Sequence, residues 1–457
     1  MWRIVSINSA TNEIVGKVVG TTSEQAKTMV EKAHATFQSW KSLTLQKRIE
    51  LLQDFAKHLE KNADKISKLM TQEMGKPITQ SEQEIARALD YLKWNFENAE
   101  KCLSPETTFE NDKTIHKVFF EPKGVVLCIQ PFNFPISQFI WQTIQNLIVG
   151  NVVVSKPDIN SPLTAKLIRE IIDTSKLPKG VLQICIGGAE LGQFLVNQNF
   201  DMFLFTGSTK TGEYISKIAG EKMIPAHLEL GGSSPAIVCA DADIATSAER
   251  IFANRFRNSG QVCDCIKRVI VHENKFDELV KNLVNEANNQ VVGNPMDKET
   301  TIGPLVNKQQ LEKLIVQVAD AVKNGAKIVY GGKQPKNLKG NFYEPTILTN
   351  IKKDMKVWQE EVFGPVLPIV TFKTVDEAIK LGNDTIYGLS ACIFTSNKET
   401  YEKISKEINA GMIALNDKNY GGAFNPFGGV KASGNARVLG KYGFRELCNI
   451  KLITFEK

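Results

Sequence analysis

The sequence lacks the marks of a membrane or secreted protein. No run of about 18 apolar residues without a charge occurs in its 457 residues, so we expect no membrane partner. The first twenty residues contain no basic segment followed by an apolar run, and they predict no secretory signal. The eight cysteines are too few for a disulfide scaffold. These absences predict a cytoplasmic protein with reduced thiols.

Support for nucleic-acid or metal binding is also missing. The formal net charge is +6, but the lysines alternate with acidic residues in helical segments such as 46–62, as on solvated helix faces. No basic stripe is interleaved with aromatic residues, so we expect no nucleic-acid partner. Cys263 and Cys265 stand close together, but no histidine or further cysteine lies at ligand spacing, so we predict no metal site.

The pattern of apolar residues predicts an α/β fold. The first hundred residues read mainly as helices. From Gly124 onward, short apolar runs alternate with helical segments, which predicts a parallel sheet with helices on both faces and strands at 125–129, 152–154, 181–186, 202–205 and 227–230. A second series begins near Pro235, with strands expected at 236–238, 269–271, 327–329, 366–370 and 412–415. Two lone β segments, 105–120 and 450–455, should pair with each other or with another subunit.

Residues with useful chemistry follow several of these strands. In an open parallel sheet, ligands bind at the carboxyl ends of the strands. Asn133 follows the first expected strand, Lys156 the second, and Glu229 lies at the end of the fifth. The Gly-rich turn 205–212 follows the fourth and opens a helix whose N–H groups suit a diphosphate. Cys263 follows a Gly-Gln pair, and as a thiolate it would be a nucleophile.

Each of these residues also has a purely structural interpretation. Asn133 would shape a loop, Lys156 would be a solvated strand end, and Glu229 would be an ion-pair partner. Cys263 would be an inert buried thiol, the common fate of cysteine. The Gly-rich turn does not match the GxGxxG pattern and is a weak signal alone. Their joint placement at strand ends favours a functional site.

At this point the chain resembles the aldehyde dehydrogenase superfamily over nearly its whole length. Six motifs carry the resemblance, in the family's order: PFNFP, FTGSTKTG, ELGGSSP, GQVCDCIKR, EEVFGP and NPFGGVKASG. The run 443–451 looks like the short bacterial succinate-semialdehyde dehydrogenases of this family. The resemblance implies a Rossmann-type dinucleotide-binding domain (1–104 and 123–231), an α/β catalytic domain (232–431) and a β extension (105–122 and 447–457) that joins a homodimer or homotetramer.

The resemblance also implies catalytic roles for three residues. Cys263 matches the nucleophile, Glu229 the general base for the deacylating water, and Asn133 an oxyanion donor that acts with the backbone N–H of Cys263. These residue types suit the chemistry, because the alkoxide formed by thiolate addition needs hydrogen-bond donors, and the thioester left by hydride transfer needs water and a base. A non-catalytic dinucleotide-binding relative would be expected to lack one of the three, and all are present.

A nicotinamide cofactor follows from the same resemblance. The positions that match cofactor contacts are Lys156 and Glu361 for the riboses, Gly207, Ser208 and Gly212 for the diphosphate, and Phe363 for the nicotinamide.

The cofactor's identity depends on the segment after Lys156. Family members that prefer NAD usually have a Glu three residues later, where this chain has Ile159. Without that carboxylate a 2′-phosphate would not be repelled, and Lys156 with Ser155 could contact it. We therefore expect NADP, with NAD as the alternative if Asp158 replaces the missing Glu.

Arg257, six residues before Cys263, indicates a substrate class. In succinate-semialdehyde dehydrogenases of this family, an Arg at this position grips the far carboxylate of the substrate. Those enzymes often carry a second Arg eight residues after the motif Asn, where this chain has Trp141. We expect succinate semialdehyde as the substrate. The alternatives are a broader specificity, for aldehydes such as lactaldehyde or glyceraldehyde, and a surface ion pair for Arg257.

Cys265 lies two residues after the expected nucleophile. In some succinate-semialdehyde dehydrogenases a similar pair forms a reversible disulfide that blocks the nucleophile, which implies that peroxide inactivates this protein through a Cys263–Cys265 bond. The structural alternative is that Cys265 is a small packed residue.

Overall fold

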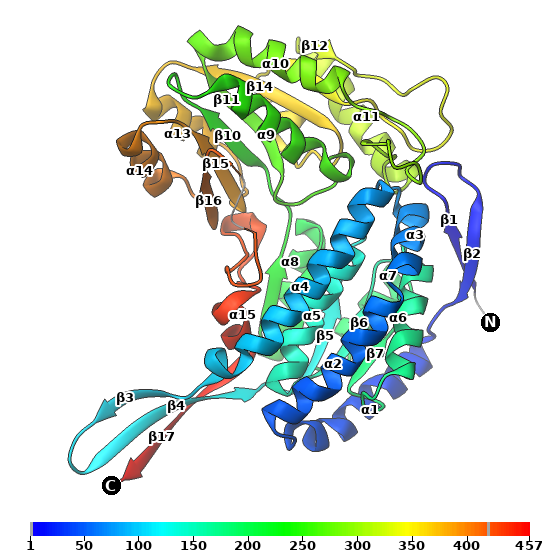
Figure 1. Ribbon diagram of the computed structural model, residues 1–457, viewed down its shortest axis with the longest axis vertical. Coiled ribbons are helices and arrows are strands. Elements are labelled where there is room, and N and C mark those ends of the chain that lie inside the picture. The colour runs from blue at the N-terminus through cyan, green and yellow to red at the C-terminus, as the bar shows by residue number, and fades with distance from the viewer. Residues whose placement is uncertain (1–2, 418–420) are drawn as a thin grey trace.

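Two α/β bodies and a projecting arm make up the computed structural model, which describes residues 3–417 and 421–457 (Figure 1). The first body contains a five-stranded sheet with the order β7-β6-β5-β8-β9, and all its neighbouring strands are parallel. This confirms the predicted parallel sheet. Its strands are β5 (Val125–Ile129), β6 (Val152–Lys156), β7 (Leu182–Ile184), β8 (Met202–Thr206) and β9 (Ala226–Glu229).

Helices cover the sheet of the first body. Four connect its strands: α5 (Pro135–Val149), α6 (Pro162–Thr174), α7 (Ala189–Val196) and α8 (Thr209–Lys222). Four more precede the sheet: α1 (Ser23–Lys41), α2 (Leu45–Lys61), α3 (Ala63–Met74) and α4 (Ile78–Leu103). The long helix α4 packs against α5 and runs from the second body to the base of the arm (Figure 1). One of its faces can therefore contribute to a site between the bodies.

The first hundred residues are mainly helical, as predicted, but a β-hairpin that was not predicted precedes the helices. Strands β1 (Arg3–Ile7) and β2 (Ile14–Val19) pair antiparallel. Only Ile4 and Val18 of the hairpin's apolar residues are buried, whereas Ile14 is 60% exposed. Packing against α3 and α6, rather than a strong local pattern, therefore stabilises these strands.

The second body contains a seven-stranded sheet with the order β12-β13-β14-β11-β10-β15-β16. All its pairs are parallel except β12 with β13. The strands are β10 (Ser234–Val238), β11 (Ile266–His272), β12 (Lys327–Tyr330), β13 (Thr346–Thr349), β14 (Val366–Phe372), β15 (Ser390–Phe394) and β16 (Met412–Leu415). The five predicted strands are present, and β13 and β15 were not predicted. The helices are α9 (Ile244–Phe256), α10 (Phe276–Asn288), α11 (Lys308–Lys323), α12 (Lys356–Gln359), α13 (Val375–Asn383) and α14 (Lys398–Glu407).

The arm joins the two segments predicted to be lone β segments. It consists of β3 (Glu106–Glu110), β4 (Thr114–Pro122) and β17 (Cys448–Glu456), in the antiparallel order β17-β4-β3. The helix α15 (Gly440–Glu446) leads into β17, which runs out to the tip of the arm (Figure 1). The predicted pairing of the two segments with each other is confirmed. On the edge strand β17, Ile450 and Leu452 are 71% and 59% exposed.

Among the described residues, no helix is both long and apolar enough to span a membrane.

Candidate active site

The carboxyl ends of the strands in the first body bring predicted site residues to one edge. Ile129 pairs with Lys156 across β5 and β6, and Thr206 pairs with Glu229 across β8 and β9. Asn133 lies in the turn between β5 and α5. Because β5 lies between β6 and β8, the turn that holds Asn133 is central to this edge.

The loop before Cys263 has an unusual backbone conformation. Asn258, Ser259 and Gly260 have consecutive φ angles of 50°, 53° and 74°, all in the left-handed region. For a residue other than glycine this conformation costs of order 1–3 kcal/mol, so surrounding contacts must stabilise it. One such contact comes from α4, where the Gln80 side chain accepts a hydrogen bond from the N–H of Asn258 at 2.8 Å.

Asn133 reaches this loop from the first body. Its Nδ2 donates to the carbonyl of Gln261 at 3.0 Å, and the Nδ2 of Asn258 donates to the carbonyl of Asn133 at 3.0 Å. Cys263 is partly exposed and lines the pocket described below. The amide of Asn133 has a second hydrogen, which can be donated to an alkoxide formed at Cys263.

Glu229 is buried at the end of β9, and neither of its carboxylate oxygens has a hydrogen-bond partner in the described part of the chain. Burial raises the pKa of this carboxyl well above its usual value, and the negative charge of Asp264 adds to the shift. The positive charge of Arg437 opposes it. A carboxylate of raised pKa is a stronger base than an exposed one and suits the activation of water.

Backbone contacts fix the position of Glu229. Glu229 forms a β-bridge with Gly434, and the N–H of Leu230 donates to the carbonyl of Ser433 at 2.9 Å. Gly434 has a φ of 122°, and a Cβ atom there would lie 1.9 Å from the carbonyl oxygen of Leu228. The last glycine of the NPFGGVKASG motif, Gly434, therefore allows the chain to pack closely against Glu229.

The N-terminus of α8 presents the predicted diphosphate site. Ser208 is exposed and caps the helix, since its side chain accepts from the N–H of Thr211. A Cβ atom at Gly207 would lie 2.4 Å from the Phe205 ring, and one at Gly212 would lie 2.5 Å from Leu230. The glycines therefore let the turn and helix pack closely. The exposed helix end, with free N–H groups and the positive end of the helix dipole, fits a diphosphate.

Glu361 and Phe363 lie beside the loop of residues 257–263, which we call the nucleophile loop. Glu361 Oε1 accepts from Lys267 Nζ at 2.5 Å and from the N–H of Gly232 at 3.1 Å. No hydrogen bond engages Oε2 within residues 3–417 and 421–457, so this oxygen can accept one from a ribose hydroxyl. The Phe363 ring stands edge-on to Phe132, with centroids 5.9 Å apart. These residues fit a nicotinamide riboside, which supplies a hydride acceptor when bound.

Lys156 and Ser155 occupy different environments. Burial lowers the pKa of the Lys156 ammonium, and the nearby carboxylate of Asp158 partly opposes this. Its Nζ has one long contact, 3.4 Å to the carbonyl of Pro157. Ser155 is fully buried, and its hydroxyl donates to Gln130 at 3.0 Å. The structure therefore places Lys156 at the strand end, as predicted, but directs Ser155 into the interior.

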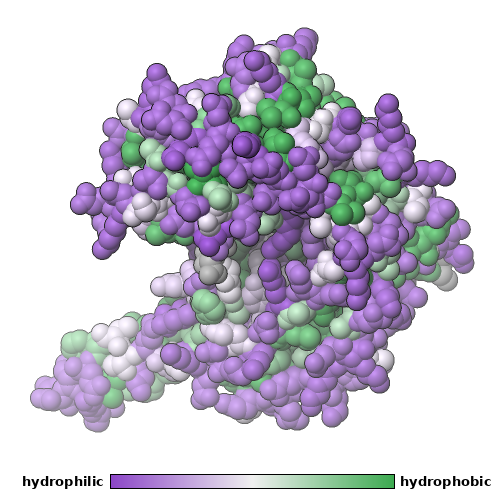
Figure 2. Space-filling model, turned by 45° about the horizontal axis from the view of Figure 1, so that its top comes forward, coloured by the Kyte–Doolittle hydropathy of each residue, from purple (hydrophilic) through white to green (hydrophobic). Residues whose placement is uncertain are grey.

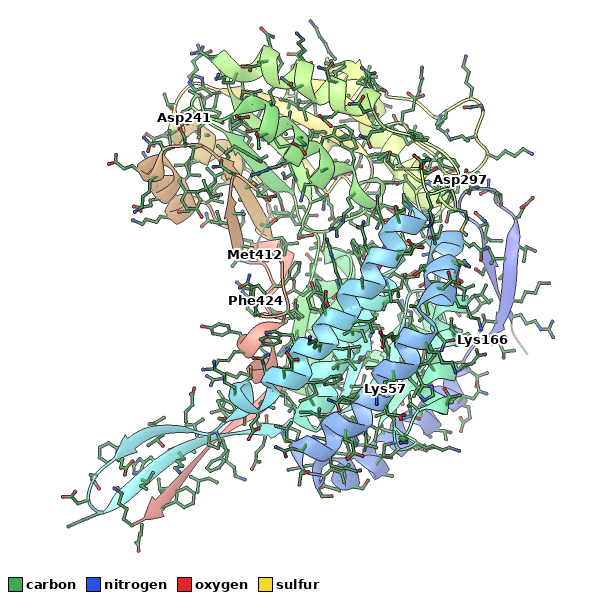
Figure 3. The ribbon with its side chains drawn as sticks, viewed as in Figure 1. Lys57, Lys166, Asp241, Asp297, Met412 and Phe424 are labelled. Atoms are coloured by element: carbon green, nitrogen blue, oxygen red, sulfur yellow. The ribbon has the colours of Figure 1, made fainter. Side chains whose placement is uncertain are left out.

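A cavity of about 530 Å³ lies where α4, α5 and the nucleophile loop meet. The space-filling view shows the surface hollowed between the two bodies (Figure 2). Trp141 forms an aromatic wall of this cavity, with ring centroids 5.4 Å from Tyr91 and 5.2 Å from Phe427. Phe424, on the segment that joins the second body to α15, also lines it (Figure 3).

Two arginines line the same cavity. Arg257 is partly exposed, and its guanidinium lies over the Phe134 ring, 5.1 Å from the centroid. Burial lowers the pKa of the Arg257 guanidinium, and the like charge of Arg87 lowers it further. Neither arginine has a side-chain hydrogen bond or an ion pair within the described residues. Arg87 was missed in the sequence, because it reads as an ordinary charge on the solvated face of a helix.

Cys265 does not line the cavity, unlike Cys263 and Asp264. Its side chain is fully buried, and its sulfur accepts from Arg255 Nη1 at 3.0 Å and lies 3.1 Å from the carbonyl of Val262. Neither Cys263 nor Cys265 forms a disulfide in this structure. The predicted disulfide therefore requires Cys265 to leave Arg255, and it stays a prediction.

Comparison with known proteins places this geometry in a family. Residues 2–453 match the aldehyde dehydrogenase family. The chain is 36% identical to a probable betaine aldehyde dehydrogenase of Schizosaccharomyces pombe, over 98% of this chain and 91% of the relative. It is 34% identical to the mitochondrial succinate-semialdehyde dehydrogenase of rice, Oryza sativa, over 98% and 85%. A crystal structure described as an E. coli NADP dependent enzyme superimposes with a TM-score of 0.96 at 30% identity, covering 100% of this chain and 95% of the other.

Replacing Glu229 with Gln should separate the two halves of the reaction. We expect the first hydride transfer to persist as a burst, while steady-state turnover falls by roughly 10²–10⁴-fold for loss of the base. In the parent, turnover should fall as pH drops through the raised pKa of Glu229, because only the deprotonated form accepts a proton from water. Stopped-flow absorbance of the reduced cofactor measures both phases. Glu221→Gln, on an exposed position, is the control, and an equal loss of burst and turnover in Glu229→Gln would contradict the assignment.

Replacing Cys265 with Ala should protect the protein from reversible inactivation by peroxide. The Cys263 thiolate would attack hydrogen peroxide, breaking its O–O bond to give a sulfenic acid and hydroxide, and the Cys265 thiol would then displace water from the sulfenic acid to form the disulfide. We expect the parent, but not Cys265→Ala, to recover activity with a thiol reductant. Cys128→Ala, which removes another fully buried thiol, should behave as the parent. Equal recovery by Cys265→Ala would exclude the disulfide.

Proposed function

Since this chain belongs to the aldehyde dehydrogenase family and oxidises an aldehyde with NAD(P), we propose that its substrate carries a distal carboxylate, as succinate semialdehyde does. The product would be the dicarboxylate, formed through a thiohemiacetal and a thioester on Cys263. The observation that carries the proposal is Arg257, whose guanidinium faces the cavity next to the nucleophile without an ion-pair partner among the described residues.

The charges around the cavity support an anionic ligand. Burial lowers the pKa of Arg257 most and the like charge of Arg87 lowers it further, and a bound anion would offset both effects. The carboxylates of Asp264 and Glu84 oppose this shift only in part, and Glu84 also pairs with the buried Lys76. A guanidinium can hold a carboxylate through two parallel hydrogen bonds. Arg87 would thus partly replace the arginine that is absent at Trp141.

A second candidate is an uncharged or cationic aldehyde. The wall formed by Tyr91, Trp141 and Phe427 would accept an apolar chain or a cation over its rings. Asp90 and Asp264 also line the cavity and would favour positive charge. The relative described as a probable betaine aldehyde dehydrogenase agrees with this candidate, and lactaldehyde or glyceraldehyde would be uncharged alternatives. The position of Arg257 over Phe134 favours the anionic substrate.

We propose NADP as the preferred cofactor. Ile159 is 37% exposed three residues after Lys156, so an apolar side chain takes the place of a ribose-binding carboxylate. Lys156 has donors to spare for a phosphate. Asp158 is partly engaged, because its Oδ1 accepts from both nitrogens of Asn160. The similar structure described as an NADP dependent enzyme supports the same choice.

The arm supports a proposal of self-association. Ile450 and Leu452 form an exposed apolar row on β17, which pairs with β4 on one side and has an unpaired outer edge. Such edges are usually covered by another chain. We propose a homodimer or homotetramer in which β17 contributes to the interface. The eight free cysteines support a reducing compartment, the cytoplasm.

Removing Arg257 should erase the preference for an anionic aldehyde. We expect kcat/KM for succinate semialdehyde to fall by about 10–100-fold in Arg257→Ala, since a hydrogen bond to a charged group contributes about 1.5–3 kcal/mol. The value for butanal should change little. Arg87→Ala should lower kcat/KM for succinate semialdehyde by a smaller factor, because Arg87 is exposed. Lys93→Ala, on the same helix but outside the cavity, is the control. A parent that prefers butanal or an aminoaldehyde would refute the proposal.

Introducing a carboxylate after Lys156 should reverse the cofactor preference. We expect the ratio of kcat/KM for NADP to that for NAD to exceed one in the parent. In Ile159→Glu it should fall by about tenfold or more, because a carboxylate repels the 2′-phosphate and accepts from the ribose hydroxyl of NAD. Initial-rate measurements with both cofactors give the ratio, and Ile159→Gln separates charge from size. A strong preference of the parent for NAD would overturn the proposal.

A further inference from the structure

Lys267 is a buried lysine whose contacts all lie within the active site. It belongs to β11 and is 1% exposed. Its Nζ donates to the carbonyl of Gly232 at 2.8 Å, to the carbonyl of Cys263 at 2.9 Å and to Glu361 Oε1 at 2.5 Å. An ammonium group has three hydrogens, so all of its donors are used.

The three acceptors belong to three separate parts of the catalytic machinery. Gly232 follows Glu229 in the ELGG turn, Cys263 is the nucleophile itself, and Glu361 presents its free Oε2 for the ribose. The ammonium also lies 5.3 Å from the centroid of the Phe363 ring, at the nicotinamide position. One side chain therefore connects the segments that carry the base, the nucleophile and the cofactor contact.

We propose that Lys267 is a positioning residue that sets the nicotinamide riboside against Cys263 for hydride transfer. It fixes Glu361 by holding Oε1, which leaves Oε2 to accept from a ribose hydroxyl when the cofactor is bound, and it fixes Cys263 by holding its carbonyl. Hydride transfer depends steeply on the separation and alignment of the two reacting carbons, so a shared anchor for both sides is effective. The inference concerns this geometry and is independent of which aldehyde is the substrate.

A lysine meets this requirement better than an arginine. The three acceptors surround a single nitrogen, which suits the compact ammonium, whereas a planar guanidinium spreads its donors in a fixed fork. The next residue, Arg268, offers the structural contrast. It is also fully buried, but its donors go to the carbonyls of Ser233, Leu381, Gly382 and Asp384, none of which is a catalytic group.

Lys267→Met tests the proposal, with a neutral aldehyde such as butanal as substrate. We expect the rate of the hydride burst to fall by about 10²-fold, as for a misplaced reacting group. The Kd of the cofactor, measured by fluorescence, should rise. Cofactor-free hydrolysis of p-nitrophenyl acetate needs Cys263 but no hydride acceptor, so it should fall by a clearly smaller factor than the hydride burst, through loss of the contact to the Cys263 carbonyl alone. Lys267→Arg should not restore the burst rate.

A matched variant and a double variant exclude a merely structural role. Arg268→Met removes the neighbouring buried cation, and any loss of activity there should affect ester hydrolysis and hydride transfer equally. Glu361→Gln combined with Lys267→Met should be no worse than the poorer single variant in cofactor Kd, because both act through one contact. The double variant buries no unpaired carboxylate and serves the same test if Lys267→Met does not fold. Equal losses of ester hydrolysis and hydride transfer in Lys267→Met would overturn the proposal. So would a double variant whose cofactor Kd rises by the product of the two single-variant factors.

Discussion

Buried cations that donate to backbone carbonyls hold the nucleophile loop in place. Arg255 is fully buried and donates to the carbonyls of Val362, Gly364 and Val366, and to Gly260 in the loop itself. Within the described residues it has no carboxylate partner. Burying such a charge is costly unless every donor is satisfied, so the loop and the segment after Glu361 must keep these carbonyls where they are. This constraint stabilises the left-handed backbone at 258–260 and makes the loop a rigid support for Cys263.

The first body supplies a second rigid support from across the site. Glu84 is buried on α4, and its Oε1 accepts from the N–H groups of Ile136 and Ser137 in the first turn of α5. It also pairs with the buried Lys76. No side chain caps this helix from its own N-cap position, so Glu84 satisfies N–H groups that would otherwise be left without partners. The turn that carries Asn133 is thereby fixed just ahead of α5. The turn of Asn133 and the loop before Cys263 are thus held by separate sets of contacts, and they meet where Asn133 bonds to Asn258 and Gln261.

The sequence predicted the strand-end residues well, because a parallel sheet brings the ends of distant strands together whatever the loops do. It could not reveal that Ser155 turns inward, since one residue along a strand decides which face a side chain meets. Arg87 was missed because its role depends on how α4 packs beside α5 and brings this residue to the same cavity as Arg257. Lys267 carried a signal that was overlooked, a lysine in a largely apolar strand, but two of its three partners lie 35 residues before it and 94 residues after it. The hairpin β1–β2 was missed because its apolar residues are mostly exposed.

The electrostatics of the site depend on two acidic groups, the buried carboxyl of Glu229 and the partly exposed thiol of Cys263. A thiolate at Cys263 and a carboxylate at Glu229, with Asp264 nearby, would place several negative charges in a region of low dielectric. The raised pKa of Glu229 avoids part of this cost, because the carboxyl group stays neutral to higher pH while the thiolate forms. Once the thiolate has become a thioester, its negative charge is gone, and ionisation of Glu229 becomes more favourable. The charge thus moves from nucleophile to base in the order that the two steps of the reaction require.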